Sequence, residues 1–230
     1  MSFFRRSQAA PVANAPPLPG GFSRDIVMLS EPAGPRAEAI RALRTQVMAQ
    51  HLSMGRRALA VVAPSVDCGC SFVTANLAVA FSQIGVKTLL LDGDLRTAGI
   101  DFLIGPRRPG VGLRACLSED VVNIASNIEE SVQPNLSVMH AGEPATDPSE
   151  LLGDVAFEQL MAACMREYDL TLIDSPPANI ASDALRLSVV AGYSLIVTRR
   201  NRSLVPDVKT LAADLAANGA KVIGTVLVER

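Results

Sequence analysis

The chain has 230 residues, of which 49% are hydrophobic and 19% are charged, and its formal net charge is −2. This length and composition predict one domain with a sizeable core. The small net charge argues against nucleic acid as a partner, and no apolar run reaches the ~20 residues that a transmembrane helix needs.

The first 30 residues are rich in Ala, Pro and Gly, as in the stretch "QAAPVANAPPLPGG". Such a composition offers too little apolar surface to fold alone. We therefore expect a flexible arm at 1–30 and a single domain at 31–230. The start, "MSFFRRSQ", lacks the apolar centre of a secretory signal, which favours a cytoplasmic location.

Short apolar runs then alternate with segments of helical periodicity. The predicted strands are 58–63, 87–92, 136–141, 169–174, 193–198 and 221–228. The predicted helices are 36–54, 71–84, 149–166, 182–190 and 204–218. Continuous apolar strands separated by helices are typical of a parallel sheet that is covered on both faces. The predicted fold class is therefore α/β, with a three-layer, doubly wound and mostly parallel sheet.

Acidic residues end two of the predicted strands. Asp92 and Asp94 follow the second strand in "LLLDGDLR", and Asp174 ends the fourth in "LTLIDSPP". Ligands of open α/β sheets bind at these strand ends, and Mg²⁺ prefers oxygen ligands. Each acid alone could be a helix cap or a turn former, but the three together indicate a metal site.

The segment after the first strand, "APSVDCGCSFVTANLAVA", has the form of a phosphate-binding loop that leads into a helix. Gly69 and Ser71 stand where such a loop has the Gly and Ser of "GKS", and Cys70 replaces the lysine. Ser71 could also be an ordinary N-cap. Cys68 and Cys70 could form a strained, redox-sensitive pair, although reduced thiols near the core are the favoured interpretation.

Taken in order, these motifs resemble the bacterial tyrosine kinase (BY-kinase) family of exopolysaccharide and capsule synthesis. The family carries "SPxPGEGKSTTAANLAVA", "LLIDADLR" and "YDxVIIDTPP" where this chain has "APSVDCGCSFVTANLAVA", "LLLDGDLR" and "YDLTLIDSPP". The family segment "LxVLPAGxxPxNPxELL" corresponds to "LSVMHAGEPATDPSELL". The E-x-x-R-x-x-R pattern of its oligomer-forming helix corresponds to Glu38, Arg41 and Arg44.

The resemblance implies a P-loop NTPase-like fold that binds ATP and Mg²⁺. Ser71, Asp94 and Asp174 would hold the metal ion. Asp92 would be the catalytic base that takes the proton from an acceptor hydroxyl. Backbone N–H groups at the start of the helix would cradle the phosphates. The predicted nucleotide-binding residues of the loop are Asp67, Cys68, Gly69, Cys70, Ser71 and Phe72.

The sequence departs from the family pattern in four ways. Cys70 cannot replace the lysine charge, which is worth about 4 kcal/mol beside a phosphate oxygen at an effective dielectric constant near 20. Asp67 stands where the family prefers glycine, and Val228 where it has an Asn that contacts adenine. A C-terminal tyrosine cluster is absent, and we expect the two tyrosines, Tyr168 and Tyr193, to lie in the core or beside strands.

An arginine could supply the missing positive charge. The segment "TRRNRS" (198–203) follows the fifth predicted strand at the ligand edge, and Arg199 is the favoured residue because arginine can bind phosphate bidentately. Arg96, which follows the paired acids, is a further candidate. A solvated basic loop is the simpler interpretation of 199–202.

The resemblance therefore predicts a regulator of exopolysaccharide or capsular polysaccharide synthesis and export, with ATP binding and tyrosine kinase chemistry weakened or lost. We expect a homo-oligomer that lies at the inner membrane through the cytoplasmic part of a polysaccharide co-polymerase. A catalytically inactive pseudo-kinase scaffold on that co-polymerase is the alternative. A partition or cell-division ATPase and a thiol sensor are less favoured.

Overall fold

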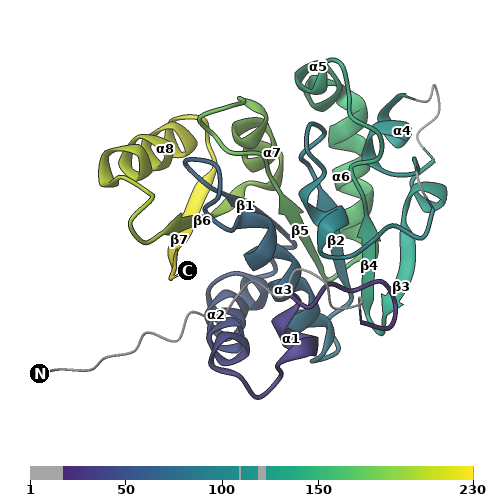
Figure 1. Ribbon diagram of the computed structural model, residues 1–230. Helices are drawn as coiled ribbons and strands as arrows, with labels where there is room; N and C mark the ends of the chain where they lie inside the picture. Colours follow the sequence, from purple (N-terminus) through teal and green to yellow (C-terminus); the bar gives the residue numbers. More distant parts are fainter. Residues whose placement is uncertain (1–17, 109, 119–122, 230) are drawn as a thin grey trace, which may run out of the picture.

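The computed structural model describes residues 18–108, 110–118 and 123–229. They form a seven-stranded sheet with helices on both faces (Figure 1). The strand order is β3-β4-β2-β5-β1-β6-β7, and only the β3–β4 pair is antiparallel. The strands are β1 (Ala58–Val62), β2 (Thr88–Asp92), β3 (Glu129–Gln133), β4 (Leu136–Met139), β5 (Leu170–Asp174), β6 (Tyr193–Arg199) and β7 (Lys221–Val228). The predicted fold class is confirmed.

Eight α-helices are described, and none of them is long and apolar enough to cross a membrane. They are α1 (Val27–Ser30), α2 (Pro35–Gln50), α3 (Cys70–Ser82), α4 (Leu113–Ser118), α5 (Pro148–Gly153), α6 (Val155–Glu167), α7 (Asp183–Ala191) and α8 (Val205–Ala217).

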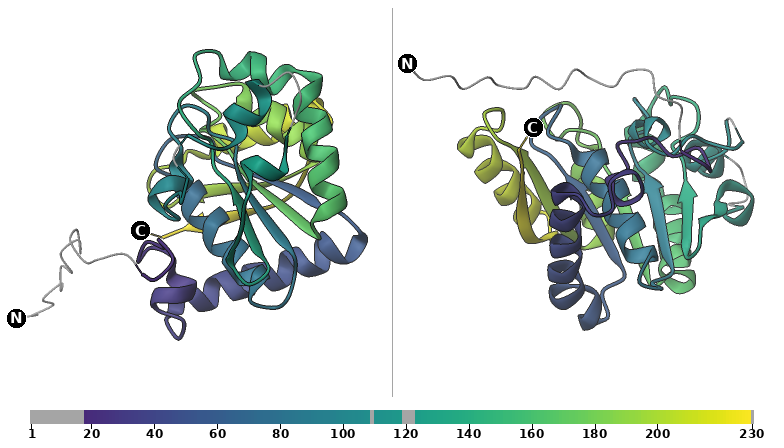
Figure 2. Two further views of the ribbon diagram at one scale, coloured as in Figure 1. Left: turned by 90° about the vertical axis from the view of Figure 1, so that its right-hand side faces the viewer. Right: turned by 60° about the horizontal axis from the view of Figure 1, so that its bottom comes forward.

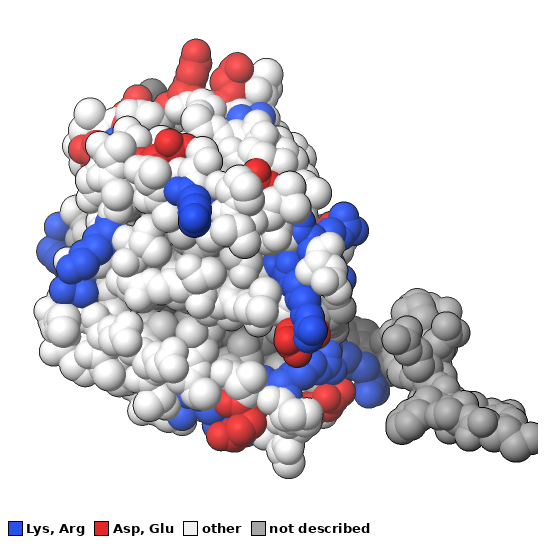
Figure 3. Space-filling model, turned by 90° about the vertical axis from the view of Figure 1, so that its left-hand side faces the viewer, with Lys and Arg blue, Asp and Glu red and all other residues white. Residues whose placement is uncertain are grey.

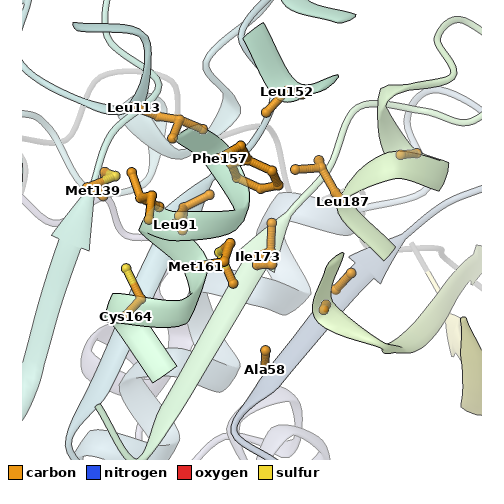
Figure 4. Close-up of a cluster of buried hydrophobic side chains, with 14 of the residues drawn as sticks. Ala58, Leu91, Leu113, Met139, Leu152, Phe157, Met161, Cys164, Ile173 and Leu187 are labelled. Carbon is orange, nitrogen blue, oxygen red and sulfur yellow. The ribbon is translucent and has the colours of Figure 1, made fainter. Parts of the chain in front are cut away.

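Two hydrophobic layers hold the helices to the sheet. Alternate strand residues face opposite sides, so Leu59 and Leu90 pack under α1, α2 and α3, whereas Ala60 and Leu91 pack against α4 to α8. The left view of Figure 2 shows this division, with the purple and blue helices below the sheet and the green and yellow helices above it. Figure 4 shows the second layer, in which Phe157 lies at the centre of a group of aliphatic side chains.

The strand order brings the predicted site segments together. β5 lies between β1 and β2, and its register places Asp174 beside Val61 on one side and Asp92 on the other. All three strands run parallel, so the loops that follow them leave the sheet at the same edge. The candidate site therefore lies at the carboxyl ends of β1, β2 and β5.

The predicted flexible arm is wrong for residues 18–30, while residues 1–17 lie outside the described part. Phe22, Ile26 and Met28 are buried in the layer under α3. Asn76 of α3 fixes the segment further, because its side chain accepts a hydrogen bond from Met28 N and donates one to Asp25 O. A few apolar residues thus anchor a segment whose average composition suggests disorder.

Two further predictions about elements need correction. The predicted helix 149–166 is two helices, because the side chain of Asp154 accepts a hydrogen bond from Ala156 N (2.8 Å) and caps the start of α6. Sequence reasoning also missed β3, an antiparallel edge strand with the mixed sequence "EESVQ". Such a strand lacks the continuous apolar run that marks the central strands.

Candidate functional site

A pocket of about 320 Å³ opens at the carboxyl ends of β1 and β5. It contains six of the predicted loop residues together with Asp94. The lining residues are Ala63, Ser65, Val66, Asp67, Cys68, Gly69, Cys70, Ser71, Phe72, Asp94, Thr97, Gly99, Ser175 and Pro177. The structure therefore brings the predicted loop and one acid of the second strand to one cavity.

The loop between β1 and α3 keeps a backbone suited to binding an anion. Gly69 has φ 87° and Asp67 has φ 58°, so the backbone is in the left-handed region at both residues. Glycine adopts this conformation easily, whereas Asp67 does so with a side chain. α3 begins at Cys70, so the first N–H groups of the helix face this end of the loop. The Asp67 carboxylate turns toward Arg202 at 3.4 Å, and this pairing offsets its negative charge.

Cys70 occupies the position of the family lysine, but its thiol does not take over the phosphate-binding role of that lysine. Its thiol donates a hydrogen bond to the Val61 carbonyl at the end of β1 (3.1 Å). Burial raises the pKa of Cys70 well above its usual value, and the nearby Asp174 charge raises it further. The thiol is therefore neutral at physiological pH and contributes neither a positive nor a negative charge to the pocket.

Asp174, at the end of β5, has one engaged and one open carboxylate oxygen. Oδ1 accepts a hydrogen bond from the Thr74 hydroxyl (3.0 Å), while Oδ2 is buried without a hydrogen-bond partner of good geometry. A Cβ built on Gly99 would lie 2.6 Å from Ser71 Oγ and 3.8 Å from Asp174 Oδ2, so both oxygens border the same small space. Burial is the main cause that raises the pKa of Asp174.

Asp92 is fully buried, and both of its oxygens are occupied. Oδ1 accepts a hydrogen bond from Asp94 N and Oδ2 accepts one from Ile100 N, each at 3.0 Å. Burial and the charge of Asp174 raise its pKa well above the usual range. In this arrangement Asp92 fixes the loop 93–100 and does not line the pocket. Its role as a base stays a prediction that the geometry does not favour.

Asp94 lines the pocket, but its oxygens bond within its own turn. Oδ1 accepts hydrogen bonds from Arg96 N (3.0 Å) and Thr97 N (3.1 Å), and Oδ2 accepts one from the Thr97 hydroxyl. Among the described residues, no three His, Cys, Asp or Glu side chains form a ready-made metal cluster. The pair that fits Mg²⁺ is Ser71 and Asp174, because Mg²⁺ is held by one or two protein ligands together with water and phosphate oxygens.

The two arginine candidates differ in position. Arg199 donates a hydrogen bond to the Asp67 carbonyl (2.8 Å), so it lies against the loop, although it does not line the pocket. Arg96 pairs with Asp183, a residue buried at the start of α7, through Nε (3.1 Å) and a terminal nitrogen (3.0 Å). Arg96 therefore links two loops of the site and is not directed at a phosphate.

The predicted oligomer residues lie on α2. Arg41 pairs with Glu38 at 2.8 Å, and the Glu38 side chain is largely exposed. Arg44 instead donates a hydrogen bond to the Ala80 carbonyl of α3 (3.0 Å). Two of the three residues thus remain at the surface of the chain, while Arg44 helps to hold α2 against α3.

Several other predictions can now be compared with the structure. The thiols of Cys68 and Cys70 are free and contact different groups, since Cys68 lies between Ser65 and Ser203. Tyr168 is buried beside β5, and Tyr193 begins β6, which confirms their predicted places. Val228 lies over the loop, with its methyl groups 3.8 Å from a Cβ built on Gly69.

Sequence reasoning missed three residues of the site, namely Thr74, Thr97 and Gly99. A signal existed for Thr74, because it lies one helical turn after Cys70 and so faces the same side of α3. Thr97 and Gly99 gave no signal, since only the folded loop brings them to the pocket.

No family model matches the chain. The tyrosine-protein kinase Wzc of Salmonella typhimurium is 32% identical over 88% of this chain and 28% of its own length. The tyrosine-protein kinase YwqD of Bacillus subtilis is 28% identical over 90% of this chain and 86% of its own length. The chain thus spans most of some relatives and about a quarter of others.

Solved structures agree with this likeness. The kinase domain of the Escherichia coli tyrosine kinase ETK superposes with a TM-score of 0.82 and 26% identity, covering 98% of this chain and 85% of that one. The shared fold, the order of the motifs and the named relatives all lead to one assignment. The chain belongs to the bacterial tyrosine kinase (BY-kinase) family.

Proposed function

We propose that this protein regulates exopolysaccharide or capsular polysaccharide synthesis and export, with its ATP binding and tyrosine kinase chemistry weakened. The observation that carries the proposal is the Cys70 thiol, which stands in the place of the phosphate-binding lysine and donates its hydrogen bond to the Val61 carbonyl. The loop keeps its shape but lacks a cation of its own. About 4 kcal/mol of phosphate attraction is thereby absent.

The remaining groups support weak binding of Mg-ATP. Ser71 and Asp174 are the residues that would hold Mg²⁺, because the buried Oδ2 of Asp174 otherwise has no hydrogen-bond partner of good geometry. Bound there, the ion would neutralise charge on the phosphate oxygens. Asp92 and Asp94 hold the loop 93–100 in position beside it, and the N–H groups at the start of α3 face the phosphates.

The proposed partner is the cytoplasmic part of a membrane polysaccharide co-polymerase, which would hold this chain at the inner membrane. Support comes from family membership and from α2, where Glu38 and Arg41 remain at the surface. We propose that these two residues contribute to a homo-oligomer and that Arg44 orients the helix that carries them.

The test is calorimetric titration of Mg-ATP into the wild type, Cys70→Lys and Cys70→Met. Methionine adds length without charge, so it separates the space at residue 70 from the ammonium group. We expect wild-type binding near or weaker than millimolar, a gain of tenfold or more in Cys70→Lys, and no gain in Cys70→Met. Micromolar binding by the wild type would contradict weakened nucleotide chemistry.

A pseudo-kinase scaffold is the second candidate, and Val228 favours it. Its side chain packs with Val61, Val73 and Val197 beside the loop, where an apolar group cannot hydrogen-bond an adenine edge. A scaffold would bind the co-polymerase segment equally with and without Mg-ATP. Pull-down with the isolated cytoplasmic segment, in the presence of ATP or of a chelator, distinguishes the two functions.

A further inference from the structure

The strand β7 lies at the edge of the sheet, and no neighbouring strand among the described residues covers its outer side. It is eight residues long, and among the described residues it is the last strand on its side of the sheet. Proteins usually protect such an edge with proline, central charges or a short strand. β7 contains no proline, and its only charged residue is Lys221 at its start. The strand therefore offers unpaired backbone groups to another strand.

The sequence of this edge is complementary to itself when read in the opposite direction. Residues 221–229 read "KVIGTVLVE", with Thr225 at the centre. Antiparallel pairing about Thr225 would place Lys221 opposite Glu229, and aliphatic residues opposite one another along the strand. The matched pairs are Lys221 with Glu229, Val222 with Val228, Ile223 with Leu227, and Gly224 with Val226.

The backbone of β7 presents the right groups for this register. The carbonyl of Val228 accepts a hydrogen bond from Arg200 N, and that of Val226 accepts one from the Thr198 hydroxyl, so both face β6. Because successive residues of a strand alternate, the N–H and C=O groups of Thr225 and Leu227 face the open edge. A two-fold axis at Thr225 would thus pass through a hydrogen-bonded residue pair.

Exposed apolar side chains lie on β7 and beside it, and they favour a contact with another apolar surface. The Leu227 side chain is 58% exposed, and Leu204 and Val205 at the start of α8 are exposed as well. Figure 3 shows this side of the molecule, where uncharged atoms cover the middle and the charged side chains lie around them. A partner that brings a second apolar strand would cover this surface without burying charges.

We propose that β7 pairs antiparallel with β7 of a second copy of this chain, with the two-fold axis at Thr225. The two sheets would then continue into one another across the axis. Glu229, which now pairs with Arg200 at 3.0 Å, would also face Lys221 of the second copy. This interface does not use Glu38 or Arg41 of α2 and does not depend on nucleotide, so it stands apart from the proposed function.

Engineered disulfides test the register. In a hydrogen-bonded antiparallel pair the two Cα atoms lie about 5.5 Å apart, which suits a disulfide, so Thr225→Cys should yield covalent dimers under mild oxidation. In the Leu227→Cys variant the Cα atoms of the two residues 227 would lie about 14 Å apart. That variant should therefore not form covalent dimers. The wild type shows any background from native cysteines. No crosslink in Thr225→Cys, or equal crosslinking in both variants, overturns the proposal.

Charge reversal tests the end contacts without threatening the fold, because the Lys221 and Glu229 side chains are exposed. The symmetric dimer contains this pair twice, so we expect Lys221→Glu or Glu229→Lys to weaken dimerisation between about twofold and 30-fold. The double variant should restore it. Sedimentation velocity measures the effect, with Glu38→Ala as the control for an oligomer formed through α2. A monomeric wild type, or single and double variants that dimerise alike, overturns the proposal.

Discussion

The Thr74 hydroxyl donates a hydrogen bond of 3.0 Å to Asp174, although the two residues lie 100 positions apart in the chain. The bond joins the helix that follows the loop to the strand that carries the candidate metal ligand. It satisfies Oδ1 of a fully buried carboxylate and leaves Oδ2 directed toward the space beside Ser71. The orientation of Asp174 therefore depends on a residue of the loop–helix segment that the sequence analysis did not assign to the site.

Replacing Thr74 with valine should destabilise the protein. Valine keeps the shape of threonine but leaves Oδ1 of Asp174 without its donor, and an unsatisfied buried oxygen costs about 1–3 kcal/mol. Urea unfolding measures the change in free energy. Thr74→Ser keeps the hydroxyl and is the control, which should lose less stability than Thr74→Val. Equal stability of Thr74→Val and the wild type would show that the bond is unimportant.

Gly93→Ala should also destabilise the protein, even though the family motif has alanine at this position. A Cβ on Gly93 would lie 2.7 Å from the Asp174 carbonyl oxygen and 2.7 Å from a Leu187 methyl group. Overpacking of this kind typically costs about 1–3 kcal/mol. Gly153→Ala, whose Cβ would meet nothing within 4 Å, is the matched control in thermal unfolding. A Gly93→Ala protein as stable as that control would mean that α7 moves freely.

The contribution of His51 to the stability of the protein should fall as the pH decreases from 6.5 to 4, whereas the buried Asp92 and Asp174, whose pKa values are raised, act in the opposite direction. The pKa of His51 is lowered to about 4, mainly by burial and in part by the nearby charge of Arg56. Between pH 4 and its unfolded-state pKa near 6.5, His51 binds a proton in the unfolded chain but not in the native chain, so this residue lowers the free energy of unfolding by up to about 3 kcal/mol.

His51→Phe isolates this contribution. Phenylalanine keeps an aromatic ring beside Tyr193, whose ring centroid lies 5.0 Å from that of His51, but it cannot titrate. Urea unfolding at a series of pH values should show that the free energy of unfolding of the wild type falls relative to that of the variant between pH 6.5 and 4. Identical slopes in the two proteins would assign the pH dependence to other groups.

The ion pair of Arg96 and Asp183 should contribute more than a surface pair. Asp183 is buried, and Arg96 reaches it through two nitrogens while Ser149 donates to the other oxygen (2.6 Å). A double-mutant cycle with alanine should give a coupling energy of about 1–2 kcal/mol, reduced by the partial exposure of Arg96. The exposed pair Arg36–Glu31 is the control, with an expected coupling below 1 kcal/mol.

Much of the fold follows from local sequence patterns. The apolar runs of β1, β2 and β5 predict buried parallel strands because such strands have no polar face, and the acids that end β2 and β5 reach one edge of the sheet as expected. The strand β3 could not be predicted in the same way, because one face of an edge strand is polar.

Side-chain orientation in the site was harder to predict. Asp92 and Asp94 lie at the end of β2 and just after it, but both carboxylates accept hydrogen bonds from backbone N–H groups of the loop that follows. Which oxygen meets which donor depends on the path of that loop, and local sequence does not determine it. The same limit applies to Cys70, where the sequence shows the missing charge but not the hydrogen bond to Val61.

Leu43 connects the surface helix α2 to the residues that border the pocket. It lies between Arg41 and Arg44 on α2, and it packs against the cluster of Val61, Val73 and Val197, which Cys70 and Phe72 of the loop also contact. Densely packed side chains transmit displacement with little loss. A displacement of α2 would therefore reach the residues that line the pocket through Leu43 and through the contact of Arg44 with α3.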